Sequence, residues 1–362
     1  MKYISEYRNA DLVRRLAERI AARVVRPYRI MEICGGQTHS IMKYNLSELL
    51  PEEITLIHGP GCPVCVTPLE KIDRALALAA RNDIILSTYG DMMRVPGSSS
   101  DLLRARSEGA DVRVVYSPLD SLAIAVDNPD KTIVFFAIGF ETTAPANALA
   151  LLRAAEMRLP NFCMISSHVL VPPAIRALLA SGDSRIDGLL APGHVCTVTG
   201  FREYETIAHD YKLPVAVTGF EPVDILRGIE ATVDMLNEER FEVENRYERS
   251  VNAGGNPGAL KTMYQAFEVC DRKWRGIGKI PASGLAIREE YSYYDAERRF
   301  DLESINTSEP EVCIAGLILQ GLSTPDSCPA FGTLCTPEKP LGAPMVSSEG
   351  ACAAYYRYKS FN

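Results

Sequence analysis

Residues 132–158 read TIVFFAIGFETTAPANALALLRAAEMR, and this stretch decides the fold. A β-rich run, Thr132–Ile138, ends in the turn GFETTAP (139–145), which contains Gly and Pro. A helical run, Ala144–Arg158, follows directly. A strand that leads at once into a helix is the unit from which parallel sheets covered by helices are built.

The same alternation continues on both sides of this unit. The other expected strands are Tyr28–Ile33, Ile54–His58, Ile84–Thr88, Val112–Tyr116, Phe162–Ser166, Ile186–Leu190 and Val215–Thr218. The other expected helices include Pro68–Ala80, Pro173–Ala180 and Pro222–Asn237. The pattern predicts an α/β protein with parallel sheets.

The expected strands favour two sheets rather than one. Ser117–Lys131 is the expected crossing point, and the echo of IGFE (138–141) in TGFE (218–221) supports a split. After about residue 240 the alternation fades, and Gly, Pro, Ser and Cys increase after Gly321. We therefore predict two similar parallel-sheet α/β domains and a loop-rich C-terminal domain, at residues 1–125, 126–238 and 239–362.

Composition restricts the class of protein. The chain has 362 residues, 47% of them hydrophobic, which is enough for two or three domains with cores. Its net charge of −8 argues against nucleic acid as a partner. The N-terminal residues 1–28 have the pattern of an amphipathic helix rather than a signal peptide, and no apolar run is long enough to span a membrane. The expected location is the cytoplasm, where stable disulfides are uncommon.

Seven unusual loops stand where expected strands end. They are CGGQTH (34–39), HGPGCPVC (58–65), YGDMMRVPG (89–97), GFETTAP (139–145), SSHVLVPP (166–173), APGHV (191–195) and GFEP (219–222). Ligands of open α/β sheets bind outside the carboxyl ends of the strands. Ordinary turn chemistry explains Gly and Pro in any one loop, but it does not explain Glu, His and Cys in most of them. The pattern predicts a site or an interface at these strand ends.

The first group of cysteines lies in two of these loops. Cys62 and Cys65 form a C-x-x-C motif, which can close a disulfide or share a metal. The following residues, Thr67-Pro68-Leu69-Glu70, read as a capping box, so a helix N-terminus is expected about two residues after Cys65. The partial positive charge there favours a thiolate, and we predict that one cysteine of the pair has a low pKa.

Cys34 belongs to the same group. It is followed by two glycines that allow a ligand to approach the backbone closely, and His39 lies five residues on. If the strands before Cys34 and Cys62 are neighbours, three thiols and an imidazole meet, and such a set suits a soft transition metal. His194, His168 and His58 lie in strand-end loops and are candidates for supporting contacts, whereas His209 is expected at the surface.

The remaining cysteines divide into two kinds. Three of them are expected to have packing roles only: Cys163, Cys196 and Cys270. The late group consists of Cys313, Cys328, Cys335 and Cys352. Four thiolates suit Zn²⁺ or an iron–sulfur cluster, and the spacing fits neither a zinc ribbon nor the usual ferredoxin run. The residues between them contain too few large apolar side chains to fold on a core, so a metal would order them. A tail of free thiols is the alternative.

Taken together, the motifs resemble one family. CGGQTHSI, HGPGCPVCVTP, YGDMMRVPG, GFETTAP, PGHV and SSEGACAAYYRY occur in the order typical of HypD-type [NiFe]-hydrogenase maturation proteins. The resemblance covers essentially the whole chain, and no motif cysteine departs from the pattern.

This resemblance implies a function. HypD-type proteins act in building the Fe(CN)₂CO group of [NiFe] hydrogenases, in complex with the chaperone HypC and with HypE as the source of cyanide. It associates Cys34, Cys62 and Cys65 with the iron and its redox chemistry, and it carries over His39. It assigns a [4Fe–4S] cluster to the four late cysteines and makes residues 239–362 a cluster domain. Glu349 and His194 are expected as supporting groups near these sites. The implied role is a redox-active assembly scaffold rather than a conventional enzyme.

Two other functions remain open at this point. A thiol–disulfide oxidoreductase with a structural zinc would account for the C-x-x-C motif and predicts a colourless protein, whereas a cluster predicts absorption near 400 nm. A purely structural adaptor predicts that replacing the cysteines leaves complex formation intact.

Overall fold

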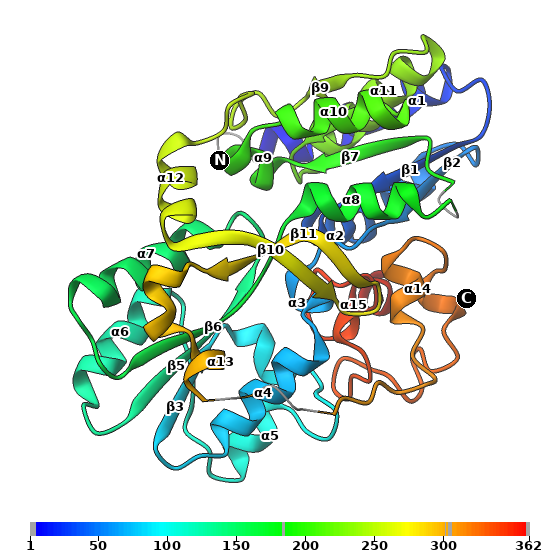
Figure 1. The fold of residues 1–362 in the computed structure, drawn as a ribbon. Helices are drawn as coiled ribbons and strands as arrows, with labels where there is room; N and C mark the ends of the chain where they lie inside the picture. Colours follow the sequence, from blue (N-terminus) through cyan, green and yellow to red (C-terminus); the bar gives the residue numbers. More distant parts are fainter. Residues whose placement is uncertain (1–4, 183–184, 301, 303–305, 360–362) are drawn as a thin grey trace.

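The computed structural model describes residues 5–182, 185–300, 302 and 306–359 (Figure 1). Its strands are β1 Tyr28–Glu32, β2 Ile54–His58, β3 Ile84–Thr88, β4 Val112–Val114, β5 Thr132–Gly139, β6 Phe162–Val169, β7 Gly188–Pro192, β8 Val215–Thr218, β9 Val243–Asn245, β10 Phe267–Trp274 and β11 Gly278–Ile287. Its α-helices are α1 Ala10–Ala21, α2 Gly35–Lys43, α3 Pro63–Val66, α4 Leu69–Ala79, α5 Leu102–Ser107, α6 Pro118–Asp127, α7 Ala144–Glu156, α8 Val171–Ala180, α9 Gly193–Thr199, α10 Arg202–Tyr211, α11 Pro222–Asn237, α12 Pro257–Ala266, α13 Ala296–Arg299, α14 Ala315–Leu319 and α15 Ala351–Tyr358.

One sheet, called sheet A here, is parallel throughout and has the order β2-β1-β7-β8-β9. Strand β1 pairs with β2 from Tyr28↔Ile54 to Glu32↔His58, which confirms that these two strands are neighbours. On its other side β1 pairs with β7, so that Glu32 lies opposite Leu190. The carboxyl ends of β1, β2 and β7 therefore lie side by side.

The other sheet, sheet B, has the order β10-β11-β6-β5-β3-β4. Its β4, β3, β5 and β6 are parallel, but β11 runs antiparallel to both β6 and β10. The prediction of two parallel sheets is therefore confirmed for sheet A and corrected for sheet B, which is mixed. The added hairpin was not predicted because its first strand, FEVCDRKW, is largely polar and buries fully only its two end residues.

The chain does not divide at residues 125 and 238 as predicted. Strands β1 and β2 belong to sheet A, whereas β3 and β4 of the same predicted domain belong to sheet B. The chain returns to sheet A at β7 and crosses again to sheet B at β10. The expected crossing at Ser117–Lys131 contains α6 and lies within the run of sheet B strands. Local alternation reveals that strands are present but not which sheet each one joins.

Several elements agree with the predicted ranges to the residue, among them β2, β3, β8 and α11. Strands β2 and β8 are short runs bounded by Gly, Pro or a charged residue, and α11 begins at a proline, so local sequence sets many of these ends. The predicted N-terminal helix is α1, where Leu16 and Ile20 face the core and the Asn9 side chain accepts a hydrogen bond from the Leu12 amide.

A single apolar core spans the two sheets. It contains Met31 and Val217 from sheet A together with Val134 and Phe136 from sheet B. Two further cores lie on the outer faces, one under α1 and α11 and the other under α7 and α12. The sheets are therefore packed into one body, and their facing edges can build a common site.

The C-terminal segment, residues 306–359, has its own small core around Cys335, Met345 and Cys352. It is tied to the sheets by polar contacts: Arg94 donates to the carbonyls of Pro337 and Val346 at 3.0 and 3.1 Å. Arg275 forms two hydrogen bonds with Glu309, each of 2.8 Å. Among the described residues, no helix is both long and apolar enough to cross a membrane.

Candidate functional site

Two of the cysteine loops pack backbone to backbone. The amide of Gly35 donates to the carbonyl of Gly61 at 2.9 Å. A Cβ added to Gly61 would overlap the backbone of Cys34, so only glycine allows this approach. The CGG loop after β1 and the GPGC loop after β2 thus form one layer at the carboxyl edge of sheet A.

The Cys34 thiol is buried in this layer. Its Sγ caps the N-terminus of α2, accepting a hydrogen bond from the Gly36 amide at 3.3 Å. His194, which follows β7, places its Nδ1 3.7 Å from the same sulfur. Burial, and then the carboxylates of Glu349 and Glu32, raise the pKa of Cys34 well above its usual value. Burial lowers the pKa of His194 to about 4. At neutral pH the pair is therefore a protonated thiol beside a neutral imidazole.

Glu32, the last residue of β1, supports this layer, and this role was not predicted. Its carboxylate is buried, accepts from the Cys34 amide at 2.8 Å, and lies 2.7 Å from Nδ1 of His58. It also accepts from the hydroxyl of Thr38. The ring of His58 meets the edge of Tyr355 on α15, with 5.5 Å between ring centroids. One buried carboxylate thus fixes the Cys34 backbone and links it to the C-terminal segment.

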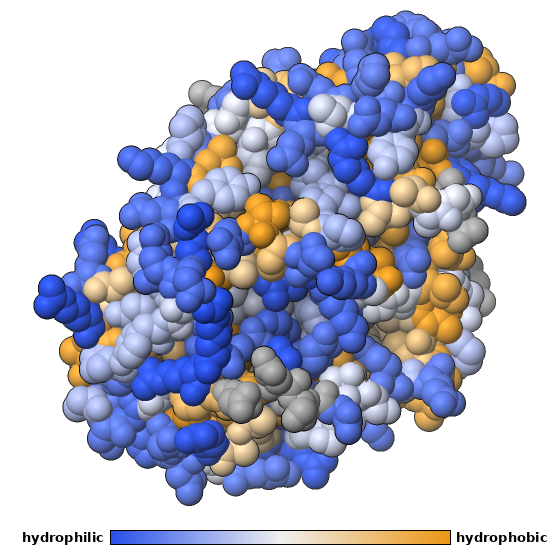
Figure 2. Space-filling view, in the orientation of Figure 1, coloured by the Kyte–Doolittle hydropathy of each residue, from blue (hydrophilic) through white to orange (hydrophobic). Residues whose placement is uncertain are grey.

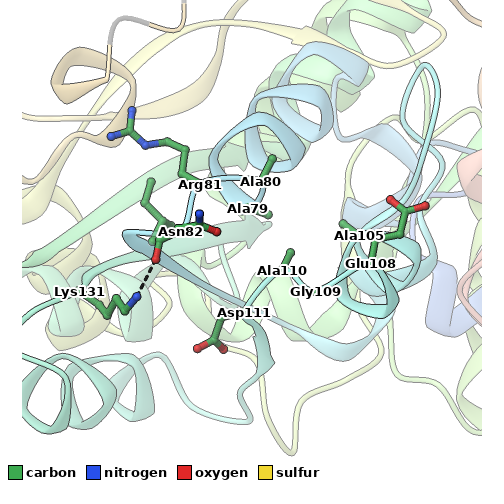
Figure 3. Close-up of a pocket in the computed structure, with 11 residues that line it drawn as sticks. Ala79, Ala80, Arg81, Asn82, Ala105, Glu108, Gly109, Ala110, Asp111 and Lys131 are labelled. Atoms are coloured by element: carbon green, nitrogen blue, oxygen red, sulfur yellow. Dashed lines mark hydrogen bonds between the residues drawn. The ribbon is translucent and has the colours of Figure 1, made fainter.

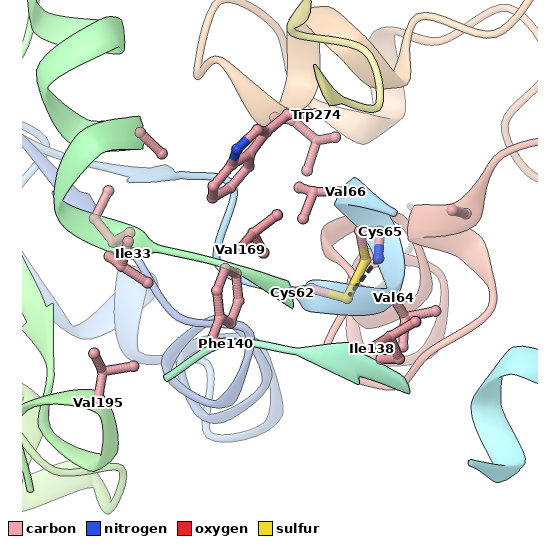
Figure 4. Close-up of a cluster of buried hydrophobic side chains, with 14 of the residues drawn as sticks. Ile33, Cys62, Val64, Cys65, Val66, Ile138, Phe140, Val169, Val195 and Trp274 are labelled. Carbon is pink, nitrogen blue, oxygen red and sulfur yellow. Dashed lines mark hydrogen bonds between the residues drawn. A yellow bond between two sulfur atoms is a disulfide. The ribbon is translucent and has the colours of Figure 1, made fainter. Parts of the chain in front are cut away.

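Cys62 and Cys65 are joined by a disulfide (Figure 4). Both are buried among apolar side chains that include Val66, Ile138 and Phe140. The C-x-x-C motif is itself helical: α3 begins after Cys62, whose Sγ accepts a hydrogen bond from the Cys65 amide at 3.2 Å. The pair does lie at a helix N-terminus, but at that of α3 rather than at the one predicted after Cys65, and Cys62 occupies the cap position. A low pKa for one of the two cysteines stays a prediction.

The capping box expected at Thr67-Pro68-Leu69-Glu70 is absent. Thr67 ends α3, and its hydroxyl donates to the carbonyl of Pro63 at 2.8 Å. Pro68 is the residue before α4 and provides no side-chain cap. Thr67 therefore follows the last residue of the short helix α3 and does not cap α4, for which the sequence pattern predicted it.

A pocket of about 380 Å³ opens beside Cys62 at the carboxyl edge of sheet B. Its walls come from the ends of β3 and β5, from α3 and from the C-terminal segment, and they include Tyr89, Asp91, Gly139 and Glu349. Cys65 does not line it. Partial burial and the nearby carboxylate of Asp91 raise the pKa of Glu349. Glu349 therefore lies in the wall of the pocket beside Cys62. Its expected role near the late cysteines stays a prediction.

His39 does not reach the Cys34 thiol in this arrangement. Its Nδ1 lies 3.1 Å from the carbonyl oxygen of Ser348, and its ring meets the edge of Tyr358 at a centroid distance of 5.3 Å. Five residues into α2, its side chain has turned towards the C-terminal segment. His194, expected only as a supporting group, is the histidine beside the thiol.

His168 lies in a buried chain of hydrogen bonds under the same pocket. The Tyr89 hydroxyl donates to Asn147 Oδ1 at 2.7 Å, and the Asn147 amide nitrogen lies 2.7 Å from His168 Nε2. Nδ1 of His168 is 3.0 Å from the Ser166 hydroxyl, which donates to the Leu285 carbonyl. Burial lowers the pKa of His168 to about 3. The chain of hydrogen bonds ends at a backbone carbonyl, and it holds the Tyr89 ring in the wall of the pocket.

The three cysteines assigned to packing lie on other elements of the two sheets and their helices. Cys163 is buried in β6, and burial raises its pKa to about 12. Cys196 is buried in α9, and Cys270 is half-buried on β10. His209 is exposed on α10, as expected. The packing role of the three cysteines stays a prediction.

The four late cysteines gather in the C-terminal segment. Burial raises the pKa of Cys352 well above its usual value, and Cys313, Cys335 and Cys328 raise it further, so the four sulfurs influence one another. Within the described residues, no three Cys, His, Asp or Glu side chains converge on a point that suits a single ion. A cubane cluster binds each sulfur through a different iron atom and needs no such convergence. Four neighbouring thiols in a segment with a small core fit a [4Fe–4S] cluster by donor chemistry.

Two other surface features lie away from the cysteine loops. A cavity of about 620 Å³ lies at the amino ends of β3 and β5, opposite the cysteines (Figure 3). Its cations are already satisfied, because Arg81 pairs with Asp83 and Lys131 donates to the Asn82 carbonyl at 2.6 Å. Apolar side chains gather on the surface around α14 (Figure 2), where Leu317 and Leu322 are exposed. Neither feature places a reactive group.

Comparison with known proteins gives consistent matches along the whole chain. A family model described as "HypD: Hydrogenase formation hypA family" matches residues 11–359. The chain is 48% identical to hydrogenase maturation factor HypD of Azotobacter vinelandii over 367 residues, covering 99% of this chain and 97% of that protein. It is 47% identical to hydrogenase maturation factor HypD2 of Bradyrhizobium diazoefficiens over 371 residues, with 100% and 98% coverage. For HypD of Escherichia coli K12 the identity is 43% over 367 residues, with 99% and 98% coverage.

Proposed function

The chain belongs to the HypD family of hydrogenase maturation factors, and we propose that it is a redox-active scaffold for assembly of the Fe(CN)₂CO group of [NiFe] hydrogenases. One observation carries the proposal. A buried thiol, Cys34, and a disulfide, Cys62–Cys65, occupy loops from neighbouring strands whose backbones touch. The thiol proposed as a metal ligand and the disulfide proposed as a two-electron couple are therefore adjacent.

Cys34 is proposed to bind the iron that is being modified, as substrate. A thiol must lose its proton before it binds iron. Nδ1 of His194 lies 3.7 Å from Cys34 Sγ, but burial lowers the pKa of this imidazole to about 4 and makes it a poor proton acceptor. In this proposal the bound iron itself lowers the pKa of the thiol, and the proton leaves to solvent. Soft thiolate ligands suit low-spin iron that carries cyanide and CO. A HypC-type chaperone would contribute a further cysteine ligand, and HypE would supply the cyanide.

The Cys62–Cys65 pair is proposed to cycle between disulfide and dithiol, which exchanges two electrons. Cys313, Cys328, Cys335 and Cys352 would hold a [4Fe–4S] cluster, which when bound supplies electrons one at a time. The hydrogen bond from the Cys65 amide to Cys62 Sγ stabilises a thiolate at Cys62 in the reduced state. We place this function in the cytoplasm, where the eight free cysteines would stay reduced.

Infrared spectroscopy tests the proposal. The protein is co-purified with its HypC-type chaperone, and cyanide and CO stretching bands are recorded. We expect bands in the wild type, none in Cys34→Ala, and wild-type bands in the matched control Cys270→Ala, whose thiol lies on β10. Bands of full intensity in Cys34→Ala would exclude Cys34 as an iron ligand.

A thiol–disulfide oxidoreductase with a structural metal is the second candidate, and the observed disulfide favours it. The two functions differ in colour. The scaffold with its cluster is expected to absorb broadly near 400 nm, whereas a zinc-containing oxidoreductase is colourless. Iron and zinc analysis of anaerobically purified protein separates them without any activity assay.

A further inference from the structure

The disulfide can be reached from one side only. Cys65 is completely buried, and its surroundings are the apolar core shared by the two sheets (Figure 4). Cys62 lines the 380 Å³ pocket beside α3, whereas Cys65 does not. An incoming thiolate must approach a disulfide sulfur directly. Cys62 is only 3% exposed, but it is the member of the pair that borders a cavity, so a thiolate can approach at Cys62 and is blocked at Cys65.

The pocket carries negative charge. Asp91, from the YGDMMRVPG loop, and Glu349, from the C-terminal segment, both line it, and they are close enough to interact electrostatically. Among the described residues that line it there is no Lys or Arg. The other lining groups are small or uncharged, such as Gly90, Thr143 and Ser347. Charge of one sign in a cleft attracts opposite charge and repels like charge at short range.

We infer that this pocket is the entry site for the thiol that reduces the pair, and that Asp91 and Glu349 select thiols borne on positively charged groups over anionic thiols. The substrate class is a cysteine thiol on a basic peptide segment. Small anionic thiols, the class to which glutathione belongs, are disfavoured. The inference deepens the redox step proposed above and rests on it.

The chemistry balances with two thiols. A first thiolate bonds to Cys62 Sγ, the bond to Cys65 breaks, and Cys65 leaves as a thiolate. A second thiolate then attacks the incoming sulfur, so that Cys62 leaves as a thiolate. The Cys65 amide, 3.2 Å from Cys62 Sγ, stabilises the charge that develops in this step. The two thiols are oxidised to one disulfide, the pair is reduced, and the two protons end on Cys62 and Cys65.

The experiment uses the full chain, isolated with its disulfide, and three probes of different charge: cysteamine, 2-mercaptoethanol and 2-mercaptoethanesulfonate. Loss of the disulfide is followed by acid quench, alkylation and mass spectrometry of the peptide that contains both cysteines. Each rate is divided by the rate of the same thiol with bis(2-hydroxyethyl) disulfide, which removes differences in thiol reactivity. The quenched mixed disulfide is located by fragmentation.

We expect the normalised rate of cysteamine to exceed that of 2-mercaptoethanesulfonate by about tenfold at low salt, and the ratio to shrink as salt rises. In the double variant Asp91→Asn, Glu349→Gln the ratio should approach one. The matched control Glu108→Gln, Asp130→Asn removes the same charge at exposed positions and should keep the wild-type ratio. The mixed disulfide should be on Cys62. Melting curves of each variant show whether it is folded.

Three results would overturn the inference. A wild-type ratio near one, or a ratio that persists in the Asp91, Glu349 double variant, would remove charge selection and leave the redox function intact. A mixed disulfide on Cys65 would remove the entry route. If all three thiols fail to reduce the pair, the redox step of the proposed function fails as well, so the two failures are distinguishable. The single variants Asp91→Asn and Glu349→Gln, each checked by its melting curve, should each lower the ratio and keep the inference testable if the double variant does not fold.

Discussion

The early and late cysteines differ in what holds them. Cys34, Cys62 and Cys65 occupy loops fixed by two sheets, by Gly–backbone contacts and by the buried carboxylate of Glu32. The late four lie in a segment with few regular elements, a small core and anchors such as Arg94. The fold of the chain positions the first group. The second group has few contacts with the sheets to position it, so a bound group would have to do so. The early thiols should keep their geometry without any bound group, and the late thiols should not.

The largest expected effect separates the two groups directly. Replacing Cys352 by Ala removes a buried late thiol from α15, and we expect the absorption near 400 nm to be lost and residues 306–359 to become susceptible to proteolysis. The Cys62–Cys65 disulfide should still form, as measured by mass spectrometry without reductant. The matched control Cys163→Ala, also buried, should keep colour and protease resistance. Loss of the disulfide in Cys352→Ala would show that the two groups are not independent.

The second prediction concerns the reactivity of Cys34. Because burial and two carboxylates raise its pKa, the thiolate is scarce below pH 9. We expect its alkylation by iodoacetamide to be more than tenfold slower than in the urea-unfolded chain at pH 8, and to keep rising up to pH 10. In the unfolded chain the rate should follow the titration of an ordinary cysteine thiol, whose pKa is about 8.5. Peptide mapping gives the rate for Cys34 alone. A folded-state profile that levels off below pH 8.5 would contradict the assigned electrostatics.

The third prediction tests the support of the early site. Glu32→Gln puts an amide where three donors converge, and we expect it to lower the free energy of unfolding by about 2 kcal/mol. The same change removes a charge that raises the pKa of Cys34, so the alkylation profile should move to lower pH. Urea denaturation and the mapping assay provide the two measurements. Glu52→Gln, at an exposed turn before β2, is the control and should change neither.

The smallest expected effect concerns the short helix of the C-x-x-C motif. Thr67→Val keeps the shape of the side chain and removes the hydroxyl that donates to Pro63. We expect a loss of about 1 kcal/mol in unfolding free energy. If α3 holds Cys62 in its cap position, the reduction potential of the pair should change as well, measured against a glutathione series. Thr206→Val on exposed α10 is the control. An unchanged potential with the expected loss of stability would limit Thr67 to a structural role.

Much of the local structure could be predicted from the sequence, because strands such as β2 and β8 are apolar runs with clear ends. The neighbourhood of Cys34 and the C-x-x-C pair was also within reach, since β1 and β2 are adjacent in the chain and in sheet A. The assignment of strands to sheets was not, because it depends on pairing between strands more than a hundred residues apart. The same limit explains the histidines: His39 is near Cys34 in sequence, but His194 reaches the thiol from the start of α9, 160 residues away.

The crossing of the chain between the sheets has a consequence for biosynthesis. Strand β1 ends at Glu32, but its partner β7 begins at Gly188. At about 5–20 residues per second, the ribosome takes roughly 8–30 s to make the intervening segment. During that interval the nascent Cys34, Cys62 and Cys65 lack the imidazole and half of the sheet that later enclose them. The nascent chain therefore exposes these three thiols at the same time. Until folding is complete, they must be protected from premature oxidation and from metal binding.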